Sequence, residues 1–159
     1  LWLDVKNINN IQNCKKLNKF LKDIIIENNH INFFIEFPSY IIENLSDYKE
    51  CIETTKSMNF KTSYYIPNDL KFRCKNNSKS EDINTNRCQY SEKLLKQLYD
   101  SNLFTDISFD YKNYEFLNKS EYIHKFYLNT WHIPDDEIVK ISNKNFRLVI
   151  PFNDDVNYN

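Results

Sequence analysis

The most restrictive feature of this sequence is what it lacks: none of its 159 residues is glycine. Glycine is the residue that most readily adopts the left-handed backbone conformation found at many turns and helix ends. Asparagine is the next best choice, because its short polar side chain tolerates that conformation. We therefore expect asparagines to end the helices, and helix patterns do give way to strand patterns at Asn28, Asn29, Asn59, Asn102 and Asn143.

Strand patterns and helix patterns alternate along the whole chain. The expected strands are short apolar stretches at residues 1–5, 31–37, 61–67, 106–111, 125–131 and 146–152. Apolar residues at helical spacing lie between them, over 11–27, 41–58, from a Ser91 cap onward, and over 114–123, with a last turn or two opening at Asp135 and Asp136. Most of the strands are apolar on both faces, which is typical of parallel strands covered by helices. The sequence therefore predicts an α/β fold.

Two α/β architectures compete, a doubly wound open sheet and a (βα) barrel. A doubly wound sheet that binds dinucleotides normally has a glycine-rich first turn, which this chain cannot supply. A barrel instead places functional side chains at the carboxyl ends of its strands, where this chain has polar residues. We therefore predict part of a (βα)8 TIM barrel, folded as one domain over residues 1–159. A complete barrel takes about 250 residues, so we expect its first two βα units upstream of Leu1.

The strand ends supply the candidate functional residues. In chain order they are Asp4 and Lys6, then Glu36, then Ser63, Tyr64 and Tyr65, then Asp110, and then Asn129 and Trp131. Alternate residues of a strand point to the same side, so Asp4 and Lys6 can face one cavity. Carboxylates beside a lysine and aromatic rings suit a divalent cation and an anionic ligand. The competing interpretation, that a charge only marks where the chain leaves the core, is favoured for any single strand end but not for all of them together.

Two of these strand ends resemble motifs of a known family. LWLDVK, at the start of the chain, is similar to the third-strand motif of glycerophosphodiester phosphodiesterases, in which the carboxylate is more often glutamate. LNTWHI, from Leu128 to Ile133, resembles the seventh-strand motif of that family. With this numbering the expected strands are strands three to eight of the barrel, and the resemblance spans the whole chain.

The resemblance implies a metal-dependent phosphodiester hydrolase of lipid metabolism. It implies that Asp4 helps to bind Ca²⁺ or Mg²⁺, that Lys6 contacts the phosphate, and that Trp131 forms a wall against the alcohol part of the ligand. The ligand would be a small phosphodiester or a lipid head group. Glu36 has no fixed counterpart in the family, so it is assigned by its position alone. The full set of expected substrate-binding residues is Lys6, Glu36, Tyr64, Asp110 and Trp131.

The family's two catalytic histidines lie on strands one and two, so we expect no catalytic residue in this chain and no activity from it as a fragment. Its own histidines, His30, His124 and His132, do not occupy matching positions, and only His132 stands where it could touch a ligand. The family's final strand ends in Thr-Asp, for which Asp154 is an open candidate. The alternative is a barrel that lost the chemistry and serves as a binding or structural domain.

Charge, hydrophobicity and cysteine content limit the possible partners and metal sites of the chain. The 21 basic and 22 acidic residues are interspersed, so we do not expect nucleic acid as a partner. No apolar run approaches the roughly 20 residues of a membrane-spanning helix, so no transmembrane segment is expected. The cysteines lack zinc-site spacing. We expect Cys14 and Cys51 as buried thiols, whereas Cys74 and Cys88 could staple the polar loop between them, and the compartment stays open.

Overall fold

The computed structural model describes residues 1–8, 10–27, 32–76, 88–138 and 145–149. Its strands form one sheet in the order β1-β2-β3-β4-β5-β6, and every neighbouring pair is parallel. They are β1 (Trp2–Asp4), β2 (Phe34–Phe37), β3 (Lys61–Tyr65), β4 (Asp106–Asp110), β5 (Tyr127–Trp131) and β6 (Phe146–Leu148). The predicted α/β class with parallel strands is confirmed.

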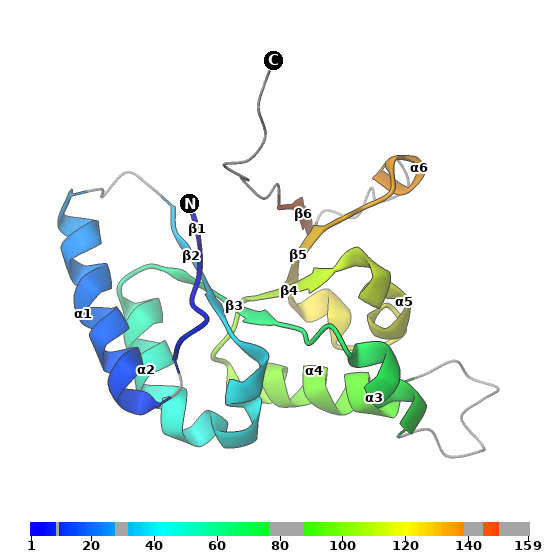
Figure 1. The fold of residues 1–159 in the computed structure, drawn as a ribbon, viewed down its shortest axis with the longest axis horizontal. Coiled ribbons are helices and arrows are strands. Elements are labelled where there is room, and N and C mark those ends of the chain that lie inside the picture. The colour runs from blue at the N-terminus through cyan, green and yellow to red at the C-terminus, as the bar shows by residue number, and fades with distance from the viewer. Residues whose placement is uncertain (9, 28–31, 77–87, 139–144, 150–159) are drawn as a thin grey trace.

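The sheet is curled into half of a barrel (Figure 1). In a flat sheet β2 and β6 would lie about 19 Å apart, four strand spacings of about 4.8 Å. Yet the guanidinium carbon of Arg147 on β6 lies only 5.2 Å from the centre of the Phe34 ring on β2. The two strands must therefore face each other across a hollow, and their side chains meet inside it.

Helices cover the outside of this curl, and none of the described helices lies on its inner side (Figure 1). In chain order they are α1 (Ile11–Glu27), the 3-10 helix η1 (Ser39–Asn44), α2 (Leu45–Ser57), α3 (Leu70–Asn76), α4 (Gln89–Ser101), η3 (Tyr111–Asn113), α5 (Tyr114–Leu117), η4 (Ile123–Lys125) and α6 (Asp135–Ile138). The sequence predicted most of these segments but missed α3, because its seven residues are too few to show a helical period. The stretch expected to form one short helix after β4 is instead η3, α5 and η4.

The two faces of the sheet differ in character. The face toward the helices is apolar, and its side chains on β2, β3 and β4 are completely buried: Ile35, Phe37, Tyr64, Ile107 and Phe109. The inner face of the same strands has Glu36, Ser63 and Ser108. The expectation of strands apolar on both faces was therefore wrong for the inner face. Hydrophobic burial fixes the helices outside, and the polar side chains line the hollow.

Two of the expected asparagine helix ends are confirmed. Asn59, after α2, has φ 66°, and Asn102, at the end of α4, has φ 53°. Both values lie in the left-handed region that asparagine tolerates. Asn28, Asn29 and Asn143 lie outside the described residues. The expected Ser91 cap is wrong: α4 begins earlier, and the Cys88 sulfur accepts a hydrogen bond from the Ser91 backbone N–H.

All four cysteines are paired, because Cys14 bonds to Cys51 and Cys74 bonds to Cys88. The second pairing agrees with the expected loop staple, whereas the expectation of free thiols at Cys14 and Cys51 was wrong. Their apolar helix faces pack against each other, which brings the two Cα atoms to 6.0 Å. Periodicity along each helix separately predicts burial but not which helices meet.

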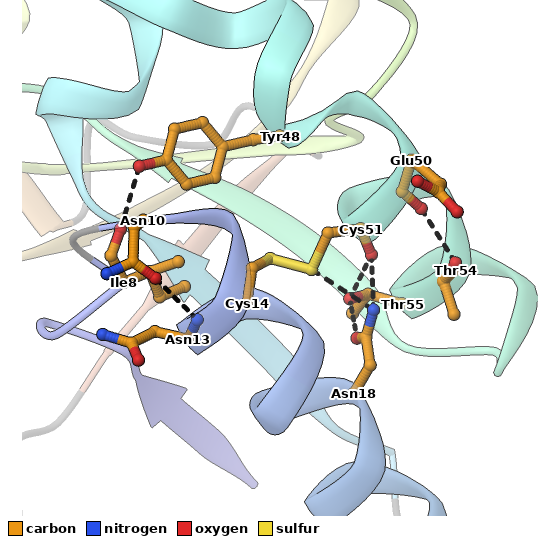
Figure 2. Close-up of a disulfide and its surroundings, with 10 residues drawn as sticks. All are labelled: Ile8, Asn10, Asn13, Cys14, Asn18, Tyr48, Glu50, Cys51, Thr54 and Thr55. Carbon is orange, nitrogen blue, oxygen red and sulfur yellow. Dashed lines mark hydrogen bonds between the residues drawn. A yellow bond between two sulfur atoms is a disulfide. The ribbon is translucent and has the colours of Figure 1, made fainter.

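Polar side chains surround the Cys14–Cys51 bond (Figure 2). The Asn18 amide donates to the Cys51 carbonyl oxygen at 2.9 Å, and the Thr55 hydroxyl donates to Asn18 Oδ1 at 2.7 Å. The Tyr48 hydroxyl donates to the Ile8 carbonyl oxygen at 3.2 Å and ties α2 to the segment before α1. The disulfide is thus embedded in a satisfied network that joins α1 to α2.

Removal of the Cys14–Cys51 bond should destabilise the protein more than removal of Cys74–Cys88, because it closes a longer loop. The sequence separations are 37 and 14 residues. Chain entropy then gives about 4 kcal/mol for the first bond and about 3 kcal/mol for the second. Urea unfolding of the two paired Cys→Ala variants measures both losses. Unchanged stability in the Cys14→Ala/Cys51→Ala variant would contradict the pairing.

Candidate functional site

The inner face of the sheet is polar near the carboxyl ends of the strands. Asp4 on β1 is paired in register with Glu36 on β2, and Glu36 with Ser63 on β3. Residues in register on neighbouring parallel strands point to the same face, so these three side chains are neighbours. Ser108 on β4 lies on the same face, and its proximity to the Glu36 carboxyl acts to lower the pKa of Glu36. We call Asp4, Glu36, Ser63 and Ser108 the polar floor, and the carboxyl ends of the strands on this inner face the mouth.

Glu36 is the most unusual member of the polar floor. The residue is only 6% exposed. Its pKa is raised to about 7, mainly by burial; the nearby Asp4 charge also acts to raise this pKa, while Ser108 and Lys6 act to lower it. Among the described residues, Glu36 Oε2 and Ser63 Oγ have no hydrogen-bond partner although both atoms are buried. Buried polar atoms are nearly always paired, so these two unpaired atoms are unusual.

Asp4 and Lys6 lie together at the edge of the polar floor, as their spacing predicted. Lys6 Nζ is 3.1 Å from Asp4 Oδ2, and 79% of the lysine side chain is exposed. The hydrogen bond to Asp4, together with the attraction between the two charges, raises the pKa of Lys6. Two opposite charges at the end of an apolar strand are therefore explained by a surface ion pair. The Lys6 ammonium has three donors, so this pair leaves it able to bind an anion.

Two aromatic rings form one side of the mouth. The Tyr65 and Trp131 rings are stacked, with centroids 6.0 Å apart and an angle of 5° between their planes. Tyr65 is on β3 and Trp131 is on β5, so the pair spans the strand between them. Burial, followed by the charges of Glu36, Asp110 and Asp4, raises the pKa of Tyr65. The Tyr65 hydroxyl thus lies within electrostatic reach of carboxylates from three different strands.

Asp110 ends β4 on the same side and is held by two neighbours. Its Oδ2 lies 3.1 Å from Lys112 Nζ and 3.3 Å from His132 Nδ1. Burial acts to raise the pKa of Asp110, but the hydrogen bonds from Lys112 and His132 outweigh it and lower that pKa. His132 has φ 57°, an uncommon conformation for this residue, and it turns the ring toward Asp110. The expectation that His132 stands beside the mouth agrees with this contact.

Tyr64 does not belong to this group, which corrects its assignment to substrate binding. Its side chain is completely buried on the helix-facing side of β3, where its ring packs against Phe104. Its hydroxyl donates to the Ser39 carbonyl oxygen at 2.7 Å, and burial raises its pKa above the ordinary range. Tyr65, the next residue, faces the mouth instead. The sequence does not show which of two adjacent tyrosines at a strand end points to the inner face. The register of β3 against Glu36 on β2 shows that it is Tyr65.

Ser108 is a functional candidate that the strand-end rule missed, because it lies in the middle of its strand. The alternation in the β4 sequence DISFD contains the necessary signal, since it places Asp106, Ser108 and Asp110 on one face. The fully buried Asp106 carboxylate lies at the opposite, amino-terminal end of the hollow, where Arg147 and the Asn129 amide satisfy it. Asn129 therefore supports this closed end and not the mouth.

Of the other residues considered for the site, His124 does not lie at the mouth. His124 lines a separate surface pocket of about 220 Å³, next to the amino ends of the strands. The other lining residues are Lys125, Phe126, Tyr127 and Asn145. This position agrees with the expectation that His124 lies away from any chemistry. His30 and Asp154 lie outside the described residues.

A divalent ion is not accommodated by the described residues alone. Asp4 and Glu36 supply two neighbouring carboxylates, but Asp4 is already paired with Lys6. No group of three or more His, Cys, Asp and Glu side chains within the described part of the chain is arranged to hold a metal ion. Asp4 could therefore contribute one ligand to a metal centre but cannot form one with its described neighbours.

Comparison with known proteins adds nothing to this geometry. No family model, no curated protein and no solved structure matches the chain. Among the described helices, none has the length and the apolar character needed to cross a bilayer. The class that the fold and the site define is an α/β half-barrel with polar side chains near the carboxyl ends of its strands.

The raised pKa of Glu36 predicts a pH-dependent stability. The folded state favours the protonated Glu36 carboxyl. Its contribution to the free energy of unfolding is therefore complete below about pH 4 and is lost as the pH rises through about 7. The shift corresponds to a change on the order of 3 kcal/mol. The measurement is the free energy of unfolding of wild type minus that of Glu36→Gln across this range. A pH-independent difference would show that the carboxyl is not buried as described.

Proposed function

We propose that this chain forms the substrate-binding side of an active site that hydrolyses a small phosphodiester. The proposal takes β1 to β6 as strands three to eight of a TIM barrel similar to glycerophosphodiester phosphodiesterases. The observation that carries it is the convergence of Asp4, Glu36, Tyr65 and Asp110 at the carboxyl ends of parallel strands. Barrel enzymes assemble their active sites at this end.

The mouth offers separate surfaces to the two parts of a phosphodiester. Lys6 is exposed and charged at its edge, and we assign it to the phosphate. Trp131 and Tyr65 offer a stacked aromatic surface that we assign to the alcohol part. Asp110, fixed by Lys112 and His132, borders the same opening. A small phosphodiester or a lipid head group could place its phosphate at the cation and its alcohol part on the aromatic surface.

The proposal includes a divalent ion, Ca²⁺ or Mg²⁺, to which Asp4 contributes one ligand. The described residues do not complete its coordination, so the other ligands would have to come from outside them. When bound, such an ion polarises a phosphoryl oxygen and stabilises developing negative charge. Within the described chain, Lys6 Nζ lies 3.1 Å from Asp4 and holds that carboxylate in place. The positive charge of Lys6 also reduces the repulsion between Asp4 and a bound phosphate.

A non-catalytic binding or structural barrel is the second candidate. One observation favours it: Asp4, the expected metal ligand, is already neutralised by Lys6, and no described cluster of ligands surrounds it. A barrel of this kind would bind a ligand at the mouth without hydrolysing it. Divalent-ion-dependent release of an alcohol from a glycerophosphodiester by the full-length protein separates the two candidates.

Replacement of Lys6 tests the assignment of the phosphate. Lys6→Met should weaken binding of glycerophosphoglycerol about tenfold, since one charge-assisted hydrogen bond is lost. Isothermal titration calorimetry measures this affinity. Lys96→Met is the matched control, because Lys96 also pairs with a carboxylate, Asp100, but on the outer helix α4. It should bind as wild type does.

Asp4→Asn extends the same test to the metal. Asp4→Asn should reduce the effect of added Ca²⁺ or Mg²⁺ on binding, because a neutral amide is a poorer ligand for a hard cation. If neither Lys6→Met nor Asp4→Asn changes ligand affinity or the effect of the ions, the phosphodiester function is wrong and the Asp4–Lys6 pair is only structural.

A further inference from the structure

The outward surface of α1 carries a concentration of positive charge. The segment from Ile11 to Lys22 contains four lysines and no acidic residue. All four are exposed: Lys15, Lys16, Lys19 and Lys22. We call these four residues the basic face. α1 lies at the margin of the molecule with α2 as its neighbouring helix, so the basic face points away from the core (Figure 1).

The basic face lacks the acidic partners found beside other surface lysines. Lys96 on α4, for example, pairs with Asp100 one turn later. No ion pair between described residues involves a lysine of the basic face. Two acids lie close by, since Asp23 follows on α1 and Glu50 of α2 lines a surface pocket with Lys15. Lysines three or four residues apart on one helix repel one another, so an external anionic partner would relieve a repulsion that these two acids only reduce.

An exposed phenylalanine stands among these lysines. Phe20 follows Lys19 directly and lies one turn after Lys16, and 58% of this phenylalanine is exposed. The apolar side of α1 is already used for packing, because Cys14 and Leu21 on that side are completely buried. Phe20 therefore adds an apolar ring to the outward surface of the helix, beside its positive charges.

We propose that the basic face and Phe20 bind the surface of a lipid bilayer that contains anionic lipids. Clusters of about four to eight basic residues on a helix are typical of binding to such lipids. The lysine ammonium groups would lie against the head groups, and the Phe20 ring would enter the boundary between head groups and acyl chains. The Cys14–Cys51 bond holds the other side of α1 on the domain, so the helix docks without leaving the fold. This surface is separate from the mouth, and the inference does not depend on the phosphodiester function.

The shape of this surface favours a bilayer over a nucleic acid. Proteins that bind single strands combine a basic groove with several aromatic rings on which the bases stack. The outward surface of α1 is instead the convex side of one helix, and Phe20 is its one exposed ring among the described residues of that helix. Lys15 and Lys22 are about 10 Å apart along the helix axis, so all four ammonium groups can reach one flat surface.

The test is co-sedimentation of the protein with vesicles of phosphatidylcholine alone or of phosphatidylcholine mixed with phosphatidylserine. Wild-type protein should bind only the mixed vesicles at about 0.1 M NaCl, and should be released at about 1 M, where the Debye length falls from about 10 Å to about 3 Å. Lys16→Gln/Lys19→Gln/Lys22→Gln should weaken binding about a hundredfold, because each lysine near an anionic surface contributes about fivefold. Phe20→Ser should weaken it severalfold, because less apolar surface is buried.

Lys49→Gln/Lys93→Gln/Lys96→Gln is the matched control, because it removes the same amount of positive charge from exposed lysines of α2 and α4. This variant should bind the mixed vesicles as wild type does. Equal binding of wild type to both kinds of vesicle, or to neither, overturns the proposal, and so does equal binding by wild type and the triple variant of α1. Binding to a single-stranded oligonucleotide that the triple variant of α1 loses, without binding to vesicles, also overturns it and makes nucleic acid the partner.

Discussion

The two-residue period of parallel strands held in register is the constraint on which the whole structure depends. It sends Ile35, Phe37 and Phe109 outward, where they are completely buried under the helices, and it sends Glu36 and Ser63 inward. Hydrophobic burial on the outer face keeps this register, because a shift by one residue would exchange the two faces. The same burial that stabilises the fold therefore assembles the polar inner face without any motif that specifies it directly.

The two ends of the hollow show how polar groups serve stability and function differently. At the amino-terminal end, the fully buried Asp106 carboxylate is satisfied by Arg147 and by the Asn129 amide, and Arg147 lies 4.1 Å above the Tyr127 ring. Both carboxylate oxygens of Asp106 are therefore paired, since the Thr105 hydroxyl also donates to it. At the mouth, Glu36 keeps an unsatisfied oxygen at a high energetic cost. This contrast is the reason to place ligand binding at the carboxyl ends and not elsewhere in the hollow.

The sequence predicted those features that depend on local period and turn chemistry. The α/β class, the strand positions and the left-handed Asn59 and Asn102 all follow from such local rules. Features that depend on contacts between distant segments could not be predicted. The bond between Cys14 and Cys51 requires that α1 and α2 pack together, and the choice between two adjacent tyrosines requires the register of β3 on β2. The grouping of Asp4, Glu36 and Asp110 was therefore predicted, whereas Ser108 was missed because it lies inside a strand and not at its end; their role in a site stays a prediction.

The central claim is that the carboxyl ends of five successive strands bring their polar and aromatic side chains together and that a ligand binds there. Chemical-shift mapping by NMR during a titration with glycerophosphoglycerol tests it most directly. The account predicts that the largest backbone amide shifts fall on Lys6, Glu36, Tyr65, Asp110 and Trp131, which come from β1 to β5 or their ends. Shifts confined to the outer helices, or to the amino-terminal end around Asp106 and Arg147, would contradict it.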